Sequence, residues 1–174
     1  MDKDLHIEAN ADSPAITFLR SGQLRIEGRA ICEDPFSFWQ PVLEWARGYA
    51  QQPAATTELA IYLEYANSSS TKYISEILYT LDDLHRRAAQ VRVVWLYDDD
   101  DDTLLRLGQD LQSMFALPFD YQGVNVQRER IQQITIKKRS NGQVVTISHR
   151  YWDAIVRNGH GAEYDVVADQ AVAS

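Results

Sequence analysis

Apolar and polar residues alternate in several short stretches of the chain, and apolar residues recur at intervals of three and four between those stretches. Alternation is typical of half-buried strands, because successive side chains of a strand point to opposite faces of a sheet. Strands are predicted for residues 15–20, 23–30, 58–65, 90–97 and 117–124. Ser21 and Gly22 separate the first two strands and suit a tight hairpin connection.

Three segments with helical spacing lie between these strands. Their apolar stripes are Phe38, Val42, Trp45 and Tyr49; Tyr73, Ile77, Leu81 and Leu84; and Leu104, Leu107, Leu111 and Met114. Asp34 and Pro35 precede the first helix, and Pro41 is expected in or near its first turn, where the missing N–H costs little. A hairpin followed by alternating helices and strands indicates an α/β fold with a mixed sheet and right-handed crossovers.

The pattern of apolar and polar residues changes after residue 125. Two strands, residues 131–139 and 143–149, flank Asn141 and Gly142, which form a strong hairpin signal. A short helix is expected over residues 151–158, with Gly159 as its cap, and the last ten residues are expected to fray. The domains predicted are therefore residues 1–125 and a hairpin-and-helix extension, residues 126–174.

Charge differs between these two parts. Of the 17 Lys+Arg and 25 Asp+Glu residues, residues 1–125 contain 10 and 20, and residues 126–174 contain 7 and 5. The main domain thus has a net charge of -10 and would repel a phosphate backbone, so nucleic acid is not expected as a partner.

The lengths and positions of the apolar segments indicate where in the cell the protein functions. No apolar run approaches the roughly 18 to 20 residues that a membrane span needs. The first residues are acidic and no apolar segment follows them, so no signal peptide is expected. A single cysteine, Cys32, excludes a disulfide framework within the chain and a multi-cysteine zinc site. We therefore expect a cytoplasmic protein that does not associate with membranes.

Five consecutive aspartates, Asp98–Asp102, follow the strand predicted at residues 90–97. One hypothesis is a metal-dependent enzyme, because magnesium and calcium prefer carboxylate oxygens. The alternative is that these residues cap the following helix, whose positive end favours acidic side chains. Adjacent residues cannot all point to one metal ion, so no metal ligand is assigned.

Other catalytic or cofactor-binding patterns do not stand out. The four histidines are scattered without metal-like spacing, and the eight glycines form no phosphate-binding loop. Cys32 has no basic neighbour in sequence that would activate a thiol. We therefore assign no catalytic residue and expect no cofactor.

Four consecutive hydroxyl residues join the strand at residues 58–65 to the second helix. They are Ser68, Ser69, Ser70 and Thr71. One interpretation is that one of them only caps the helix, since serine is a favoured N-cap. The other is phosphorylation, which adds about -1.5 to -2 charges at a helix end that favours anions.

The residues around this hydroxyl run resemble a known family. Leu63-Glu64-Tyr65-Ala66-Asn67-Ser68-Ser69-Ser70-Thr71-Lys72 is similar to the signature of the SiaC family of bacterial regulatory phosphoproteins. Further matching pieces occur in order: Ser13-Pro14-Ala15-Ile16, Gly28-Arg29, Glu33-Asp34, Phe38-Trp39-Gln40-Pro41, Glu44-Trp45, Trp95-Leu96-Tyr97, and Gly108 with Asp110. The resemblance covers about residues 5–124.

This resemblance implies a STAS-like fold, similar to that of anti-sigma-factor antagonists, and a non-enzymatic switch. The family's phosphosite directly follows the motif asparagine and therefore falls on Ser68, with Tyr65, Asn67, Ser69, Ser70, Thr71 and Lys72 as motif neighbours. A Ser/Thr protein kinase adds the phosphate and a PP2C-like phosphatase removes it. The unphosphorylated form binds and activates a diguanylate cyclase, which raises cyclic di-GMP and favours biofilm formation.

Three positions depart from the family pattern. Ser68 replaces the usual threonine, Ala66 replaces a larger apolar residue, and Cys32 stands where proline is typical. An anti-sigma kinase in place of the cyclase remains an alternative partner within the same switching mechanism.

Overall fold

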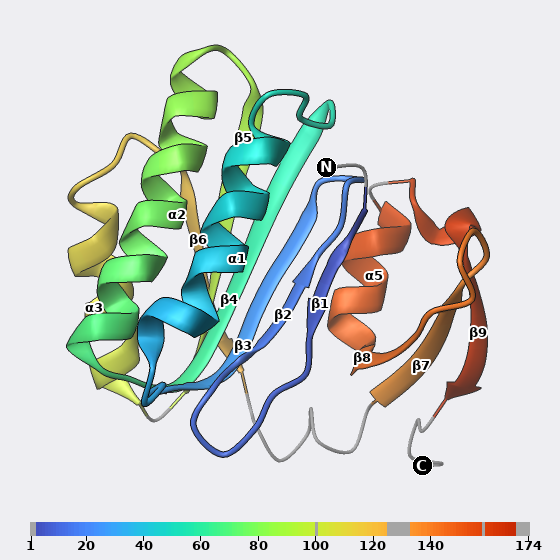
Figure 1. The fold of residues 1–174 in the computed structure, drawn as a ribbon, viewed down its shortest axis with the longest axis horizontal. Helices are drawn as coiled ribbons and strands as arrows, with labels where there is room; N and C mark the ends of the chain where they lie inside the picture. Colours follow the sequence, from blue (N-terminus) through green and yellow to red (C-terminus); the bar gives the residue numbers. More distant parts are fainter. Residues whose placement is uncertain (1–2, 100, 125–132, 158, 170–174) are drawn as a thin grey trace. The chain divides into compact units, whose positions relative to one another are not determined.

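The computed structural model describes residues 3–99, 101–124, 133–157 and 159–169, and the chain forms two compact units, Met1–Gly123 and Val124–Ser174 (Figure 1). A six-stranded sheet with strand order β1-β2-β3-β4-β5-β6 forms the base of the first unit. Its strands are β1 (Leu5–Ile7), β2 (Ala15–Phe18), β3 (Gln23–Ala30), β4 (Thr56–Ala66), β5 (Gln90–Asp98) and β6 (Phe119–Val124).

The sheet is mixed, as the sequence predicts. Strands β1, β2 and β3 pair antiparallel, whereas β3, β4 and β5 pair parallel. The parallel neighbours are joined by helices α1 (Pro35–Tyr49) and α2 (Ser68–Arg86), and α3 (Asp102–Gln112) connects β5 to β6. The carboxyl ends of β3 and β4 therefore lie at the same edge of the sheet, where α1 and α2 begin.

The three helices pack against one face of this sheet, and α1 and α2 lie side by side in front of it (Figure 1). Apolar side chains from alternate positions of β3, β4 and β5, among them Ile26, Ile61 and Val93, form a single core with the helices. Trp39 of α1 and Trp95 of β5 are almost fully enclosed in it. The indole N–H of Trp95 donates to the carbonyl oxygen of Leu104 at 2.9 Å, which fixes α3 against the sheet.

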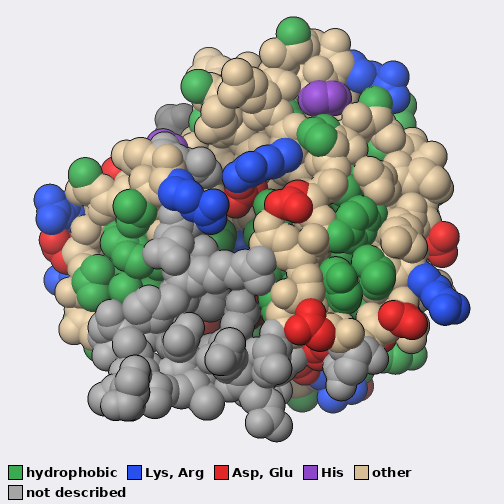
Figure 2. Space-filling model, turned by 180° about the vertical axis from the view of Figure 1, so that it is seen from behind, with side chains coloured by type: hydrophobic (Ala, Val, Ile, Leu, Met, Phe, Trp, Pro, Cys, Tyr) green, Lys and Arg blue, Asp and Glu red, His purple; other side chains and the backbone are tan. Residues whose placement is uncertain are grey.

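Charged side chains occupy alternate positions of the strands on the opposite face. Arg25 pairs with Glu27 at 2.7 Å, and Arg92 of β5 pairs with Glu58 of β4, its direct neighbour in register. Figure 2 shows lysine, arginine and acidic side chains on the surface seen from behind. No helix among the described residues is both long and apolar enough to span a membrane.

The second unit contains an antiparallel sheet with strand order β8-β7-β9 and a helix. Its elements are β7 (Gln133–Lys138), β8 (Val144–Ser148), α5 (His149–Arg157), the 3-10 helix η1 (Gly161–Glu163) and β9 (Tyr164–Asp169). The predicted hairpin is confirmed, with Gly142 at a φ of 74° in its turn. The helix begins at His149, two residues earlier than predicted, and Asn158 lies outside the described residues.

Several sequence expectations were wrong in detail. Residues 165–169 do not fray but lie in β9, where Asp165 pairs with Arg139 across the sheet. Strand β1 was not predicted, because three residues are too few to show alternation. Pro41 lies in the second turn of α1, since Asp34 caps the helix one residue before Pro35. Met114 lies beyond the end of α3 and is exposed.

Candidate functional site

The hydroxyl run lies at the start of α2, and Asn67 supplies the cap of this helix. The side-chain oxygen of Asn67 accepts a hydrogen bond from the backbone N–H of Ser70 at 2.8 Å. Its own backbone N–H donates to the carbonyl oxygen of Ala30 at 3.0 Å, at the end of β3. The interpretation that one of the four hydroxyl residues is the cap is therefore wrong, because the asparagine before them has this role.

The four hydroxyl groups differ in accessibility. Ser68 and Ser69 are exposed at the first two positions of α2. Ser70 is fully buried, and its hydroxyl accepts a hydrogen bond from the indole N–H of Trp39 at 3.4 Å. Thr71 is half-buried and donates its hydroxyl proton to the carbonyl oxygen of Asn67 at 2.9 Å. Only Ser68 and Ser69 of this run thus present an exposed side chain to a modifying enzyme.

Residues from three chain segments surround the start of α2. Tyr65 is 57% exposed near the end of β4, and it pairs in register with Arg29 of β3, just after an irregularity between Gly28 and Arg29. Gly28 has a φ of 112°, a backbone conformation that side-chain-bearing residues rarely adopt. The family-like pieces at these positions and in α2 therefore come together at one edge of the sheet.

Helix α1 is linked to the start of α2 by aromatic packing. The rings of Trp39 and Tyr73 stack with their centroids 6.3 Å apart. Asp34 caps α1 by accepting hydrogen bonds from the hydroxyl of Ser37 at 2.7 Å and from its N–H at 3.1 Å. These bonds, the side-chain one first, lower the pKa of Asp34. Both helices thus begin with a side-chain cap at the same edge.

The charges around Ser68 favour an added anion locally. Its backbone belongs to the first turn of α2, where the partial positive charge of the helix is concentrated. Lys72 is exposed four residues later, and residues four apart are neighbours on a helix surface. A phosphate on Ser68 would therefore lie within reach of a lysine ammonium group.

Two aspartates of the acidic run, Asp98 and Asp101, have separate partners. Asp98 accepts a hydrogen bond from the hydroxyl of Tyr62 at 2.9 Å. Burial first and this hydrogen bond second raise the pKa of Tyr62 above its ordinary value. Asp101 caps α3 by accepting from the N–H groups of Thr103 at 2.8 Å and Leu104 at 3.3 Å, so the capping interpretation is confirmed for this residue.

Metal-binding residues do not converge in the part of the chain that the structure describes. No group of three or more His, Cys, Asp or Glu side chains is placed there to hold a metal ion. Asp100 lies outside the described residues. Cys32, the free cysteine, is buried.

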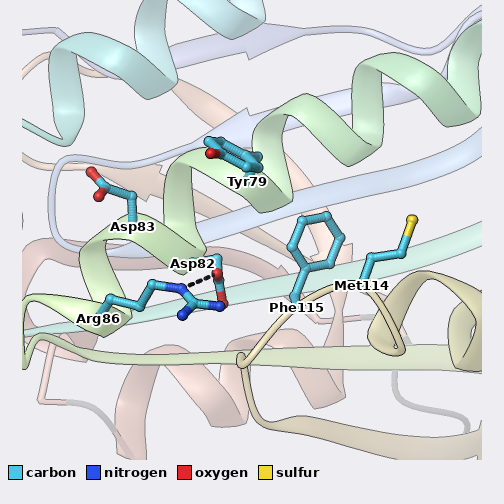
Figure 3. A pocket seen from close by; sticks show the side chains of 6 residues that line it. All are labelled: Tyr79, Asp82, Asp83, Arg86, Met114 and Phe115. Carbon is cyan, nitrogen blue, oxygen red and sulfur yellow. Dashed lines mark hydrogen bonds and ion pairs between the residues drawn. The ribbon is translucent and has the colours of Figure 1, made fainter.

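A second feature of α2 was not found from the sequence. Its C-terminal half and the segment after α3 form an open cavity of about 320 Å³, lined by Tyr79, Asp82, Asp83, Arg86, Met114 and Phe115 (Figure 3). Asp82 and Arg86 stand four apart in the sequence, which is a local signal that an ion pair forms here. The apolar wall comes from a segment more than 25 residues away, which no local pattern connects to α2.

Comparisons with known proteins agree with this arrangement. An uncharacterized protein of Pseudomonas aeruginosa (strain UCBPP-PA14) is 28% identical over 120 residues, which cover 68% of this chain and 95% of that protein. The solved structure of apo-SiaC from Pseudomonas aeruginosa is 27% identical, covers 70% of this chain and 99% of its own, and has a TM-score of 0.65.

A further solved structure contains diguanylate cyclase SiaD in complex with its activator SiaC, also from Pseudomonas aeruginosa. The matching chain of that structure is 27% identical to the chain described here and has a TM-score of 0.67. The match covers 70% of the chain described here and 100% of the matching chain. The model of the SiaC family regulatory phosphoproteins matches residues 7–124, which include the whole of α2 and both walls of the cavity. The chain described here therefore belongs to the SiaC family of regulatory phosphoproteins.

Proposed function

We propose that this protein is a phosphorylation-controlled partner switch whose form unphosphorylated at Ser68 binds and activates a diguanylate cyclase. A Ser/Thr protein kinase adds the phosphate and a PP2C-like phosphatase removes it, and the exchange takes place in the cytoplasm. The chain itself carries out no catalysis in this scheme. The observation that carries the proposal is the exposed Ser68 directly after Asn67, in a helix that does not need the serine as a cap.

The partner is proposed from a relative. SiaC of Pseudomonas aeruginosa has been solved in complex with the diguanylate cyclase that it activates. The match to that structure covers the full length of its matching chain. Only Ser68 of the two exposed serines directly follows the asparagine, which is the position that the family pattern gives to the modified residue. Ser69 is the natural comparison, because it is also exposed and stands one position further along.

A phosphate on Ser68 would oppose partner binding through its charge. It adds roughly -1.5 to -2 charges, and a partner that covers Ser68 must strip water from those charges when it binds. The helix end and Lys72 stabilise the phosphate in the free protein, so they favour the unbound form as well. Burying a charge without a matched partner is costly, and the complex therefore dissociates.

The test compares four purified forms with each diguanylate cyclase of the host. They are the unmodified chain, Ser68→Ala, a chain with phosphoserine incorporated at position 68, and Ser69→Ala as matched control. Cyclic di-GMP production is measured by chromatography. We expect activation by the unmodified chain and both alanine variants, and none by the phosphorylated chain. Equal production with and without phosphoserine at position 68 would refute the switch.

A further inference from the structure

Five exposed residues of α2 form a stripe along one face of the helix, with the half-buried Ser75 between Lys72 and Tyr79. The helix buries its opposite side, and these five positions follow one another at intervals of four, seven, four and three. The stripe consists of Ser68, Lys72, Tyr79, Asp83 and Arg86. Positions with this spacing lie on one face of a helix. The proposed phosphosite and the cavity at the other end of α2 thus share one surface.

The cavity end of this stripe exposes apolar side chains. Tyr79 is 71% exposed and Met114 is 59% exposed, although both are large. Figure 3 shows Tyr79 on α2 and the ring of Phe115 directed toward this helix from the segment after α3. Tyrosine, methionine, phenylalanine and arginine are the residue types enriched at protein interfaces.

A buried carboxylate holds the two walls of the cavity together. Asp82 accepts a hydrogen bond from the backbone N–H of Ala116 at 2.7 Å with one oxygen, and from Nε of Arg86 at 2.6 Å with the other. The segment with Met114 and Phe115 is therefore fixed to α2 before any partner arrives. A preformed cavity loses little conformational entropy when it is filled.

The charges beside the cavity are already paired. Arg86 is bonded to Asp82, and Arg87 is bonded to Asp83. The main cost of burying ionic side chains arises when a charge has no counter-charge. A partner that covers this region does not incur that cost, because both arginines already have a carboxylate partner. The volume of about 320 Å³ stands at the lower end of ligand pockets and has room for one or two side chains. Tyr79, Met114 and Phe115 are the lining residues that an apolar side chain would contact.

The cavity and Ser68 lie close enough along α2 for one interface to cover both. Eleven residues separate Ser68 from Tyr79, which is about 16 Å at 1.5 Å per residue. A standard interface covers about 800 Å² of each partner, a patch roughly 30 Å across. An interface that covers Ser68 and follows α2 therefore reaches the cavity.

We propose that the diguanylate cyclase lies along the exposed stripe of α2 and inserts an apolar side chain into the cavity formed by Tyr79, Met114 and Phe115. This inference rests on the proposed function and assigns its interaction surface. Ser68 then controls one end of the interface through charge, while the cavity at the other end anchors the partner.

The test measures the dissociation constant of the cyclase that the chain activates, by titration calorimetry with the full unphosphorylated protein. Tyr79→Ala removes the apolar wall from α2, and Met114→Asp places a charge at the mouth of the cavity. Both side chains are exposed, so thermal unfolding should stay close to that of the parent protein. Tyr79→Phe keeps the ring, and Gln109→Ala, at an exposed position of α3, is the matched control.

We expect Tyr79→Ala and Met114→Asp to weaken binding at least about tenfold, as truncation of an interface anchor does. Tyr79→Phe and Gln109→Ala should bind like the parent. Parent-like affinity of both cavity variants would overturn this inference and leave the switch intact, provided that phosphoserine at position 68 still prevents binding. Failure of the parent chain to bind any cyclase would instead reject the proposed function itself.

Discussion

The side-chain oxygen of Asn67 accepts the backbone N–H of Ser70 at 2.8 Å, so the residue before the hydroxyl run both ends β4 and starts α2. Replacing an N-cap asparagine by alanine costs about 1 kcal/mol of protein stability. We expect this loss for Asn67→Ala in urea unfolding at neutral pH. Asn67→Asp should retain most of the stability, and Ser68→Ala should change it by less than about 0.5 kcal/mol. A larger loss for Ser68→Ala would show that the serine contributes to the cap.

Carboxylate substitution of Ser68 should imitate phosphorylation only in part. Ser68→Asp adds one negative charge, whereas a phosphate adds up to about two and has three acceptor oxygens. Cyclase binding, measured by titration calorimetry, should therefore be weaker for Ser68→Asp than for Ser68→Ala, and weakest for the phosphoserine form. Ser69→Asp is the control for an acidic residue at the neighbouring position, which is also exposed. Identical affinities for the two aspartate variants would argue against a specific role of position 68.

Gly108 allows α3 to approach the sheet closely. A Cβ atom at this position would lie 2.6 Å from Cε2 of Trp95, a buried ring that cannot withdraw. Although alanine favours helix more than glycine does, overpacking of this kind typically destabilises by about 1 to 3 kcal/mol. We expect Gly108→Ala to lower the denaturation midpoint, and Gln109→Ala, at the exposed neighbour, to leave it nearly unchanged. An unchanged midpoint for Gly108→Ala would mean that α3 can shift without cost.

Acid should lower the free energy of unfolding of the protein, partly through protonation of Asp82. Burial opposes ionisation of this carboxyl, but the hydrogen bonds from Arg86 and from the N–H of Ala116 outweigh burial and lower its pKa. A group with a lowered pKa in the folded state stabilises the protein fully above its unfolded pKa, near 4. This contribution is lost as the pH falls from about 4 through the lower folded pKa.

Urea unfolding at a series of pH values tests this assignment, with Asp82→Asn as the variant. The variant should be less stable at pH 7 and should lose less further stability below pH 4 than the parent does. Asp34 also has a lowered pKa, so some acid sensitivity should remain in the variant. A pH profile of the variant parallel to that of the parent would exclude Asp82 as a contributor.

The order of helices and strands in the first unit could be predicted because its signals are local. Alternating apolar positions predicted β3, β4 and β5, and spacings of three and four predicted α1, α2 and most of α3. The three-residue strand β1 and the edge strand β9 escaped prediction, since one is too short to show a period and the other was taken for a frayed end. Met114 continued the apolar spacing of α3 but lies past its end.

The two parts of the candidate site differed in how readily the sequence indicated them. The hydroxyl run was visible, but its four members could not be ranked, because only the fold shows that Ser70 faces Trp39 while Ser68 and Ser69 face outward. The cavity was invisible, because Phe115 meets α2 only through the packing of α3 against the sheet. Its organising residue, Asp82, bonds to a backbone N–H 34 residues away.

The cap of Asn67 determines how a modification at its neighbour would act. The asparagine joins the end of β3 to the first turn of α2 through Ala30 and Ser70, and Ser70 is in turn held by the indole of Trp39. A charge added to Ser68 is therefore attached to a backbone that hydrogen bonds hold in place from β3, α1 and α2. Unlike switches that order or melt a loop, this protein would change the charge of its surface while its backbone keeps its conformation. Hydrogen exchange in α2 beyond its first turn should therefore be the same before and after the modification.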